Sequence, residues 1–205
     1  MKDGTFGERR IPLVYRSQWR DVAREEWRPR ACGIAVLAML LAYAKPGQDI
    51  PDLDRMIDDG VARGAHDPTI GWIHAGLIAL ANEFDVALES RVYRAKAVNE
   101  VEHLASKGLA EISTELALLR PVIASVRRGF SDTGTPHMVV LSGVGEDAEG
   151  KYFLVHDPDS EVEEGAQYRR VSREQFEKNW RKLAIFWKPS GATRGDANSP
   201  KNPLK

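Results

Sequence analysis

The sequence predicts an α+β protein in which helices come first and an antiparallel sheet follows. Three observations lead to this fold class: a length suited to one domain, helical periodicity up to about residue 119, and short β-branched runs after it. Of the 205 residues, 42% are hydrophobic and 29% are charged, which is an ordinary globular composition. We expect one folded domain at 11–187, a flexible N-terminus at 1–10 and a disordered, almost wholly polar tail at 188–205.

The first half of the domain carries helical patterns. Residues 11–15 predict a short strand or an extended arm. Residues 31–44 are apolar nearly all round, which predicts a central helix that is covered on every side. Lys45-Pro46-Gly47 ends this helix. Apolar residues at spacings of three and four predict further helices at 52–61, 69–84, 97–106 and 111–119.

The second half of the domain carries sequence patterns that predict β-strands. β-branched and aromatic runs at 121–126, 137–144 and 152–155 are separated by turn residues, which is typical of an antiparallel sheet. Ser172-Arg173-Glu174-Gln175 matches a capping box and predicts a helix that continues through Trp180. A last strand is expected at 183–187.

Charge and cysteine content exclude several classes of function. The formal net charge is −1, which gives no electrostatic reason to expect a nucleic acid or an anionic membrane as partner. A single cysteine rules out an internal disulfide and any multi-thiolate zinc or iron–sulfur site, and we expect no cofactor. The longest apolar run is shorter than the ~20 residues that span a bilayer, and no secretory signal is visible, so a cytoplasmic protein is expected.

The lone cysteine, Cys32, stands at the start of the most apolar helix. The positive end of the helix macrodipole favours a thiolate and lowers the pKa of the thiol. Gly33 removes side-chain bulk next to the sulfur. A small buried cysteine with no chemical role fits the same position, so the decision depends on a partner that can act as a base.

Among the five histidines, His137 is placed best to be that base, because it begins a strand that is otherwise apolar. Asp157 closes the next strand. If the hairpin between them centres near Asp147, positions 137 and 157 lie opposite each other and share a face. The imidazole and the carboxylate would then meet across the two strands.

The other histidines are weaker candidates. His156 points to the opposite face from Asp157 by strand alternation. His66 precedes Asp67-Pro68, which favours an Asx turn. His74 and His103 fall on helical patterns and are expected at the surface or with a hydrogen-bond partner. No histidine spacing supports a metal site.

Several motifs occur in an order that resembles the peptidase C39-like family of papain-like cysteine peptidases. They are Cys32-Gly33, Gly71-Trp72, Gly76-Leu77, residues 120–126, residues 137–143, Asp157-Pro158 and residues 172–176. The resemblance runs from about Ile11 to Trp187. It implies a papain-like fold and a peptide or protein substrate. It also implies that Cys32 is the nucleophile, His137 the general base and Asp157 the residue that orients the imidazole.

The family also uses a glutamine upstream of the cysteine in its oxyanion hole, and the resemblance makes Gln18 the candidate. Here the sequence departs from the commoner pattern. Thirteen residues, rich in Arg and Glu, separate Gln18 from Cys32, and Ile34 stands where many relatives have proline. Trp19 and Trp27 flank the cysteine and are candidates to line a substrate cleft, whereas Trp72, Trp180 and Trp187 are expected in the core.

Two alternatives to peptide hydrolysis stay open. A protein deamidase or acyltransferase uses the same triad on another acceptor. A binding module on an inactive papain-like scaffold would keep the fold and leave Cys32 with ordinary reactivity. In the best-known relatives the domain is fused to a transporter and trims leader peptides after Gly-Gly. This sequence has no transmembrane segment and no phosphate-binding Gly-x-x-x-x-Gly-Lys loop, so that specificity does not carry over.

Overall fold

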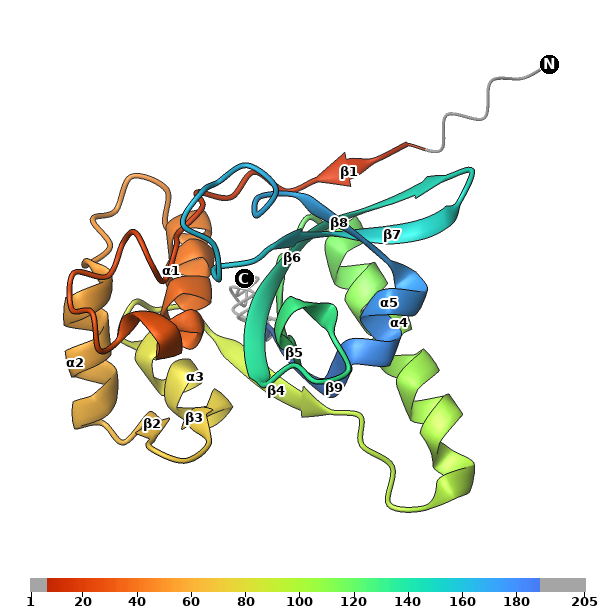
Figure 1. Cartoon of the computed structure of the whole chain (residues 1–205), viewed down its shortest axis with the longest axis horizontal. Coiled ribbons are helices and arrows are strands. Elements are labelled where there is room, and N and C mark those ends of the chain that lie inside the picture. The colour runs from red at the N-terminus through yellow and green to blue at the C-terminus, as the bar shows by residue number, and fades with distance from the viewer. Residues whose placement is uncertain (1–6, 189–205) are drawn as a thin grey trace, which may run out of the picture.

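A twisted antiparallel sheet forms the centre of the molecule (Figure 1). The computed structural model describes residues 7–188. Within them, six strands follow one another across the sheet in the order β4-β9-β5-β6-β7-β8, and β1 pairs with the far end of β6. The strand bounds are β1 Arg9–Arg10, β4 Leu88–Val92, β5 Val122–Arg127, β6 Pro136–Asp147, β7 Gly150–His156, β8 Arg169–Ser172 and β9 Trp180–Trp187.

Helices cover both sides of this sheet. α1 (Cys32–Ala44) packs on β6 and, with α2 (Leu53–Ala62) and α3 (His74–Asn82), forms a group on one side. α4 (Val101–Ala117) and α5 (Arg173–Asn179) lie on the other side, as Figure 1 shows. The connections hold a small hairpin and three short 3-10 helices: β2 (His66–Asp67) with β3 (Gly71–Trp72), then η1 (Arg28–Arg30), η2 (Val98–Glu100) and η3 (Arg128–Phe130).

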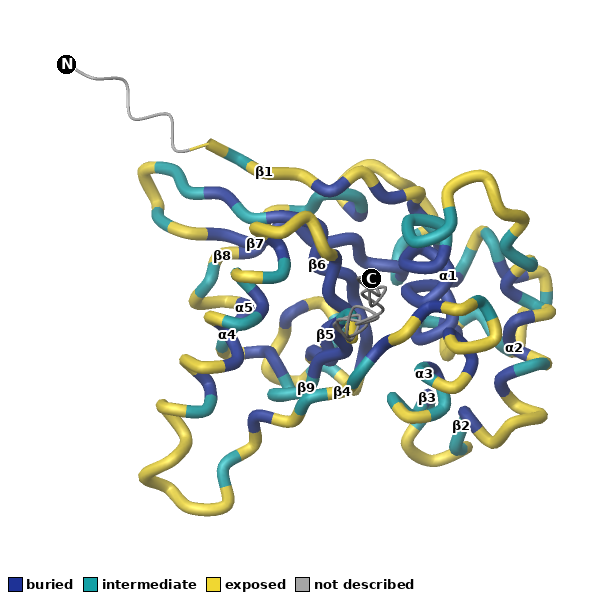
Figure 2. Tube along the Cα trace, turned by 180° about the vertical axis from the view of Figure 1, so that it is seen from behind, coloured by how far each residue is buried: buried dark blue, intermediate teal, exposed yellow. Residues whose placement is uncertain are grey.

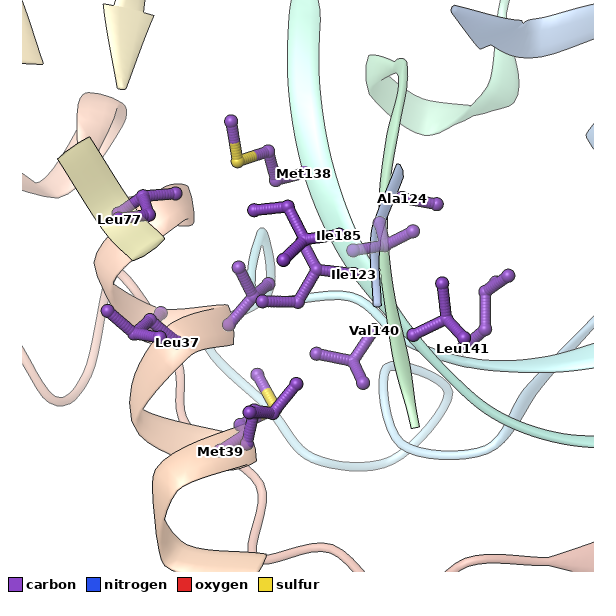
Figure 3. Close-up of a cluster of buried hydrophobic side chains, with 14 of the residues drawn as sticks. Leu37, Met39, Leu77, Ile123, Ala124, Met138, Val140, Leu141 and Ile185 are labelled. Atoms are coloured by element: carbon purple, nitrogen blue, oxygen red, sulfur yellow. The ribbon is translucent and has the colours of Figure 1, made fainter. Parts of the chain in front are cut away.

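The core lies between α1 and the sheet. Every residue from Gly33 to Leu41 is buried, as its apolar sequence predicts, and Figure 2 shows the burial concentrated in α1 and the central strands. Leu37 of α1 and Leu77 of α3 face Ile123, Val140 and Ile185 of the sheet (Figure 3). This packing fixes the position of α1, and hence of its first residue, against the strands.

The α+β class and the papain-like arrangement of a central helix on an antiparallel sheet are confirmed. Two expected helices, 97–106 and 111–119, are wrong as separate elements because they form the single helix α4. Gly108 continues the helix here instead of breaking it. A side chain at this position would collide with Trp180 and Tyr93, so the glycine allows the helix to approach them closely.

The helix expected at 69–84 begins later than predicted. Asp67 Oδ1 accepts hydrogen bonds from the backbone N–H groups of Thr69 (2.7 Å) and Ile70 (2.9 Å), which is the Asx turn expected after His66. This turn closes the β2–β3 hairpin, and α3 starts only at His74. A side-chain-to-backbone turn therefore replaces the first helical turn.

Near the C-terminus, Ser172 caps α5 by accepting from the Gln175 N–H at 3.1 Å, as the capping box predicts. The helix ends at Asn179, however, and Trp180 already belongs to β9, which begins before the expected residue 183. Near the N-terminus, residues 11–15 form an extended arm. Arg9–Arg10 belong to the sheet, whereas 1–6 and 189–205 lie outside the described residues. No helix in the described part of the chain has the length and apolar content to cross a membrane.

Candidate active site

Cys32 is the first residue of α1. The N-cap residue, Ala31, has no side-chain acceptor, whereas α2 is capped by Asp52, which accepts from the Arg55 N–H at 2.8 Å. The first N–H groups of α1 have no acceptor within the helix, and alanine supplies none. The start of this helix therefore offers hydrogen-bond donors and a positive dipole beside the sulfur.

Trp72 packs over the start of α1. A Cβ at Gly33 would lie 2.7 Å from Cβ and Cγ of Trp72, so only glycine fits there without displacing the ring. The indole Nε1 of Trp72 donates to the Arg30 carbonyl at 2.8 Å. This bond fixes the turn that leads into Cys32.

His137 lies at the start of β6 and is only 2% exposed. Its Nε2 is 2.7 Å from Asp157 Oδ1. The other ring nitrogen, Nδ1, is buried and has no hydrogen-bond partner among residues 7–188. Burial opposes the charged form, but the hydrogen bond and charge of Asp157, together with the neighbouring thiol of Cys32, outweigh it and raise the pKa of His137 to about 10.

The contact between His137 and Asp157 was expected, but the register that produces it differs from the prediction. Asp147 pairs with Gly150, so the hairpin does not centre at Asp147, and a bulge between Leu141 and Gly143 shifts the ladder again. Beyond this bulge Val140 pairs with His156, and β7 ends there. One residue further, Asp157 falls opposite Val139. It reaches His137 as a diagonal neighbour on the same face.

Asp157 is also the turn residue after β7. Its Oδ1 accepts from the Asp159 N–H at 3.0 Å, and its Oδ2 lies 3.9 Å from an Arg169 nitrogen. Burial alone would raise the pKa of Asp157. The hydrogen bond and charge of His137, followed by the Asp159 N–H and Arg169, outweigh it and hold the pKa below its usual range. Asp157 is therefore ionised beside the imidazole.

The surroundings of Cys32 favour its thiolate. Cys32 is partly buried, and loss of solvent around its sulfur is the largest single effect on its pKa; by itself this effect would raise the pKa. The imidazole of His137, the backbone N–H of Met138 and the charge of Arg128 together outweigh that cost and lower the pKa of Cys32. The lowered pKa of Cys32 and the raised pKa of His137 both favour a thiolate–imidazolium pair over a neutral thiol and imidazole.

Cys32 and His137 line the same cleft, whose volume is about 330 Å³. The β2–β3 hairpin forms one wall of it, and Arg128 and Arg181 contribute to its margin. Residues 7–188 hold no group of three or more His, Cys, Asp or Glu side chains that could bind a metal ion.

Gln18 is fully buried and does not line this cleft. Its backbone N–H donates to the Pro158 carbonyl at 3.0 Å, which places it beside the turn that carries Asp157. Both polar atoms of its side-chain amide, Nε2 and Oε1, are buried without a partner in the described chain. A buried amide without hydrogen bonds lowers the stability of the folded protein. Unpaired buried polar groups are rare in proteins, and a functional role is one explanation for them.

A model of the Peptidase_C39 like family matches residues 11–184. The chain belongs to this family. It is a cysteine-type peptidase, as the sequence resemblance implied. The match covers the whole sheet except β1 and the last residues of β9. A comparison with curated protein sequences finds no significant match.

Solved structures share the fold of this C39-like peptidase. A C39-like peptidase from Bacillus anthracis aligns with a TM-score of 0.58 and 17% identity, over 90% of this chain and 99% of its own. A double glycine motif protease from an AMS/PCAT transporter, crystallised with the leader peptide, aligns at 0.54 and 19%, over 91% and 98%. The peptidase domain of Streptococcus ComA, a bifunctional ABC transporter, aligns at 0.52 and 21%, over 88% and 99%.

The other histidines of the peptidase form no hydrogen bond with Cys32, His137 or Asp157 among the described residues. His156 is fully buried, and its Nδ1 is 2.8 Å from Ser142 Oγ. His74 bridges the hydroxyl oxygens of Ser90 (2.9 Å) and Ser125 (2.8 Å), as expected for a histidine with partners. His66 belongs to the β2–β3 hairpin and lines the cleft.

Sequence reasoning missed part of the cleft wall. Trp72 is in the core as expected but also lines the cleft, whereas Trp19 and Trp27 do not line it. Trp27 instead packs edge-on against His66. Arg181 also lines the cleft and was not singled out, because nothing in its local sequence distinguishes it from other arginines of this chain.

Proposed function

We propose that this C39-like peptidase hydrolyses peptide bonds with Cys32 as nucleophile, His137 as general base and acid, and Asp157 as the group that orients the imidazole. One observation carries the proposal. Asp157 binds Nε2 of a buried His137, while the unpartnered Nδ1 belongs to a ring that lines the same cleft as Cys32. This is the division of roles that thiol-based acyl transfer needs.

In the first step the Cys32 thiolate attacks the carbonyl carbon of the scissile bond. The imidazolium of His137 then gives its proton to the departing amine, and the acyl group remains on sulfur. In the second step neutral His137 takes a proton from water, whose oxygen attacks the acyl carbon. The carbon–sulfur bond then breaks, which releases the carboxylic acid and restores the Cys32 thiolate beside the imidazolium of His137. Asp157 stabilises the imidazolium in both steps and holds the ring in place.

Negative charge develops on the carbonyl oxygen during both steps. The backbone N–H of Cys32 lies in the first turn of α1, where the N-cap residue Ala31 supplies no side-chain acceptor, and we assign it as one donor to this oxygen. We assign the second donor to the side-chain amide of Gln18, supported by its burial and by its lack of any other partner among the described residues. One such donor typically contributes about 2.7–4 kcal/mol to transition-state stabilisation.

A peptide or protein is the substrate class that the cleft and the family support. The related protease from the AMS/PCAT transporter was crystallised with a leader peptide. The cytoplasmic location expected from the sequence stays a prediction.

The test uses the full chain and a proteome-derived peptide library. Wild type should create new peptide termini, detected by mass spectrometry, and Cys32→Ala should create none. The fold of the variant, measured by circular dichroism, should be unchanged because the lost volume is small and alanine favours helices. The same cleavage pattern from both proteins would refute the proposal.

The same digest also tests the acyl-transfer alternatives. A one-dalton gain at Gln or Asn without cleavage would assign the thiol to deamidation instead of proteolysis. Labelling of Cys32 by iodoacetamide at pH 6 tests the inactive-scaffold alternative, which requires a rate no faster than that of free cysteine.

A further inference from the structure

The cleft beside Cys32 carries positive charge. Arg30, Arg128 and Arg181 line it, and no Asp or Glu is present among the described residues that line it. The chain as a whole is balanced, with 29 Lys and Arg against 30 Asp and Glu. The positive charge is therefore a local property of the cleft, and it attracts anionic groups.

These arginines differ in how they are held. Arg128 is engaged by the protein itself, because a guanidinium nitrogen donates to the Pro29 carbonyl at 2.9 Å and Nε lies 3.4 Å from Asp159 Oδ2. Arg181 forms no ion pair with any carboxylate in residues 7–188. Its burial and the neighbouring charge of Arg94 lower the pKa of its guanidinium. Arg94 donates through Nε to the Arg181 carbonyl at 3.2 Å.

Two adjacent arginines without a carboxylate are an unfavourable arrangement for a half-buried site. The charge of Arg94 adds to the cost of burying the Arg181 guanidinium, and no carboxylate of residues 7–188 pairs with Arg181 to offset it. A carboxylate from another molecule would remove this cost. Guanidinium is also the side chain that matches a carboxylate best, through two parallel hydrogen bonds.

An irregularity in the sheet gives Arg181 its position. Ser125 of β5 pairs with Leu183, but its neighbour Val126 pairs with Trp180, so Arg181 and Lys182 are extra residues in β9. Lys182 has a φ of +61°, a conformation that non-glycine residues rarely adopt. Bulges of this kind occur next to active sites, where they redirect a side chain.

The two bulged residues point to different surroundings. Lys182 folds back onto the protein, where its Nζ donates to the Glu177 carbonyl at 2.9 Å and lies over the ring of Trp180. Arg181 lines the cleft. The strained backbone therefore presents one cation to the space in which Cys32 reacts and keeps the other away from it.

From this geometry we propose that Arg181 binds a carboxylate of the peptide substrate. The carboxylate belongs to an Asp or Glu side chain close to the scissile bond or to the C-terminus of the peptide. The inference rests on the proposed function, because it adds a recognition group to the cleft of Cys32. It makes the enzyme selective for acidic peptides.

Three alkylating reagents test the proposal on the full chain, in which Cys32 is the single cysteine. N-iodoacetyl-glutamic acid α-amide carries a side-chain carboxylate, N-iodoacetyl-glutamine carries an α-carboxylate, and N-iodoacetyl-glutamine α-amide is neutral. Intact mass spectrometry gives the second-order rate for each reagent. Dividing each charged reagent's rate by the neutral reagent's rate cancels changes in the reactivity of the thiolate itself.

The ratio for at least one charged reagent should fall about three- to fivefold in Arg181→Gln, the factor that a partly exposed ion pair contributes. Arg181→Lys keeps the charge and should keep most of the ratio. Arg173→Gln is the matched control, because Arg173 lines a separate pocket and the substitution removes the same charge. The effect of Arg181→Gln should disappear in 1 M NaCl, where the Debye length is about 3 Å.

The two charged reagents distinguish the two sources of carboxylate. A fall for the glutamic acid amide alone assigns a side chain, and a fall for glutamine alone assigns a C-terminus. Unchanged ratios in Arg181→Gln, or an equal fall in Arg173→Gln, overturn the inference. Alkylation of Cys32 does not require peptide cleavage, so a failure here and a failure of the proposed hydrolysis are separate results.

Discussion

Asp157 uses one carboxylate oxygen for two purposes. Oδ1 is hydrogen-bonded to His137 Nε2 at 2.7 Å and also accepts a hydrogen bond from the Asp159 N–H at 3.0 Å. The turn and the orientation of the imidazole are therefore not alternative roles, because the turn fixes the oxygen that the imidazole uses. A substitution at this residue acts on stability and on the thiolate together.

The first prediction compares Asp157→Asn with Asp157→Ala. Asparagine keeps an oxygen for the Asp159 N–H and for His137, so the turn and part of the activity should survive. Alanine loses both bonds and should cost about 1 kcal/mol or more in the free energy of unfolding. Without the carboxylate the pKa of His137 falls and that of Cys32 rises. The pH profile of Cys32 alkylation should therefore move to higher pH in Asp157→Ala. An unmoved profile would leave Asp157 as a turn residue only.

The second prediction concerns Gln18, whose side-chain amide is expected to lower stability and to support activity. Its amide is buried and unpaired in the described chain, so it costs stability in the absence of substrate. We expect Gln18→Met, which has a similar volume, to unfold at the same or a higher urea concentration than wild type. If the amide donates to the oxyanion, kcat should fall about a hundredfold while KM changes little. Wild-type kcat in this variant would remove Gln18 from the oxyanion hole.

At the scale of elements, the side chain of Trp72 packs against both α1 and α2 and also lines the cleft. A Cβ at Gly33 of α1 would lie 2.7 Å from Cβ of Trp72, and a Cβ at Gly60 of α2 would lie 2.7 Å from Cζ3 of its indole ring. The two glycines are thus matched to the two ends of one side chain. This packing holds the β3 end of the hairpin against the start of α1.

The third prediction follows from this packing. Gly60→Ala should destabilise the wild-type protein, because the collision with the outer indole ring costs about 1–3 kcal/mol, more than alanine gains in helix propensity. Phenylalanine lacks that ring, so Gly60→Ala in a Trp72→Phe background should be neutral or stabilising. Urea unfolding of the four proteins gives the coupling energy. Equal effects in both backgrounds would show that the indole does not exclude the methyl group.

For the whole molecule, buried neutral histidines set the acid limit of stability. Burial lowers the pKa of His156 to about 4, and burial with the charges of Arg181 and Arg94 lowers that of His74 to about 4. In the unfolded chain both titrate near 6.5. Between these values the unfolded chain binds more protons than the folded protein, so stability falls as pH falls.

The fourth prediction is a loss of stability between pH 6.5 and pH 4, with a slope of at most about 1.4 kcal/mol per pH unit for fully buried His156. His156→Leu should lower this slope by about one proton in urea unfolding at several pH values. An unchanged acid slope in His156→Leu would contradict the assignment.

The sequence by itself determined the features that arise within a few residues. The apolar run that begins at Cys32, the capping box at Ser172 and the Asx turn at Asp67 depend on propensity and on side-chain bonds to nearby backbone. The order of the motifs was enough to indicate the family. His137 and Asp157 were also paired correctly, because each stands at the end of an apolar strand.

Only the tertiary structure decided how these residues meet. The bulge at Ser142 sets the diagonal contact of His137 with Asp157, Gly108 lets α4 run through, and the bulge before Leu183 turns Arg181 into the cleft. Each of these depends on packing between segments far apart in the chain. A local pattern carries no information on such contacts, since strand register and bulges are selected by what the neighbouring strand and helix bury.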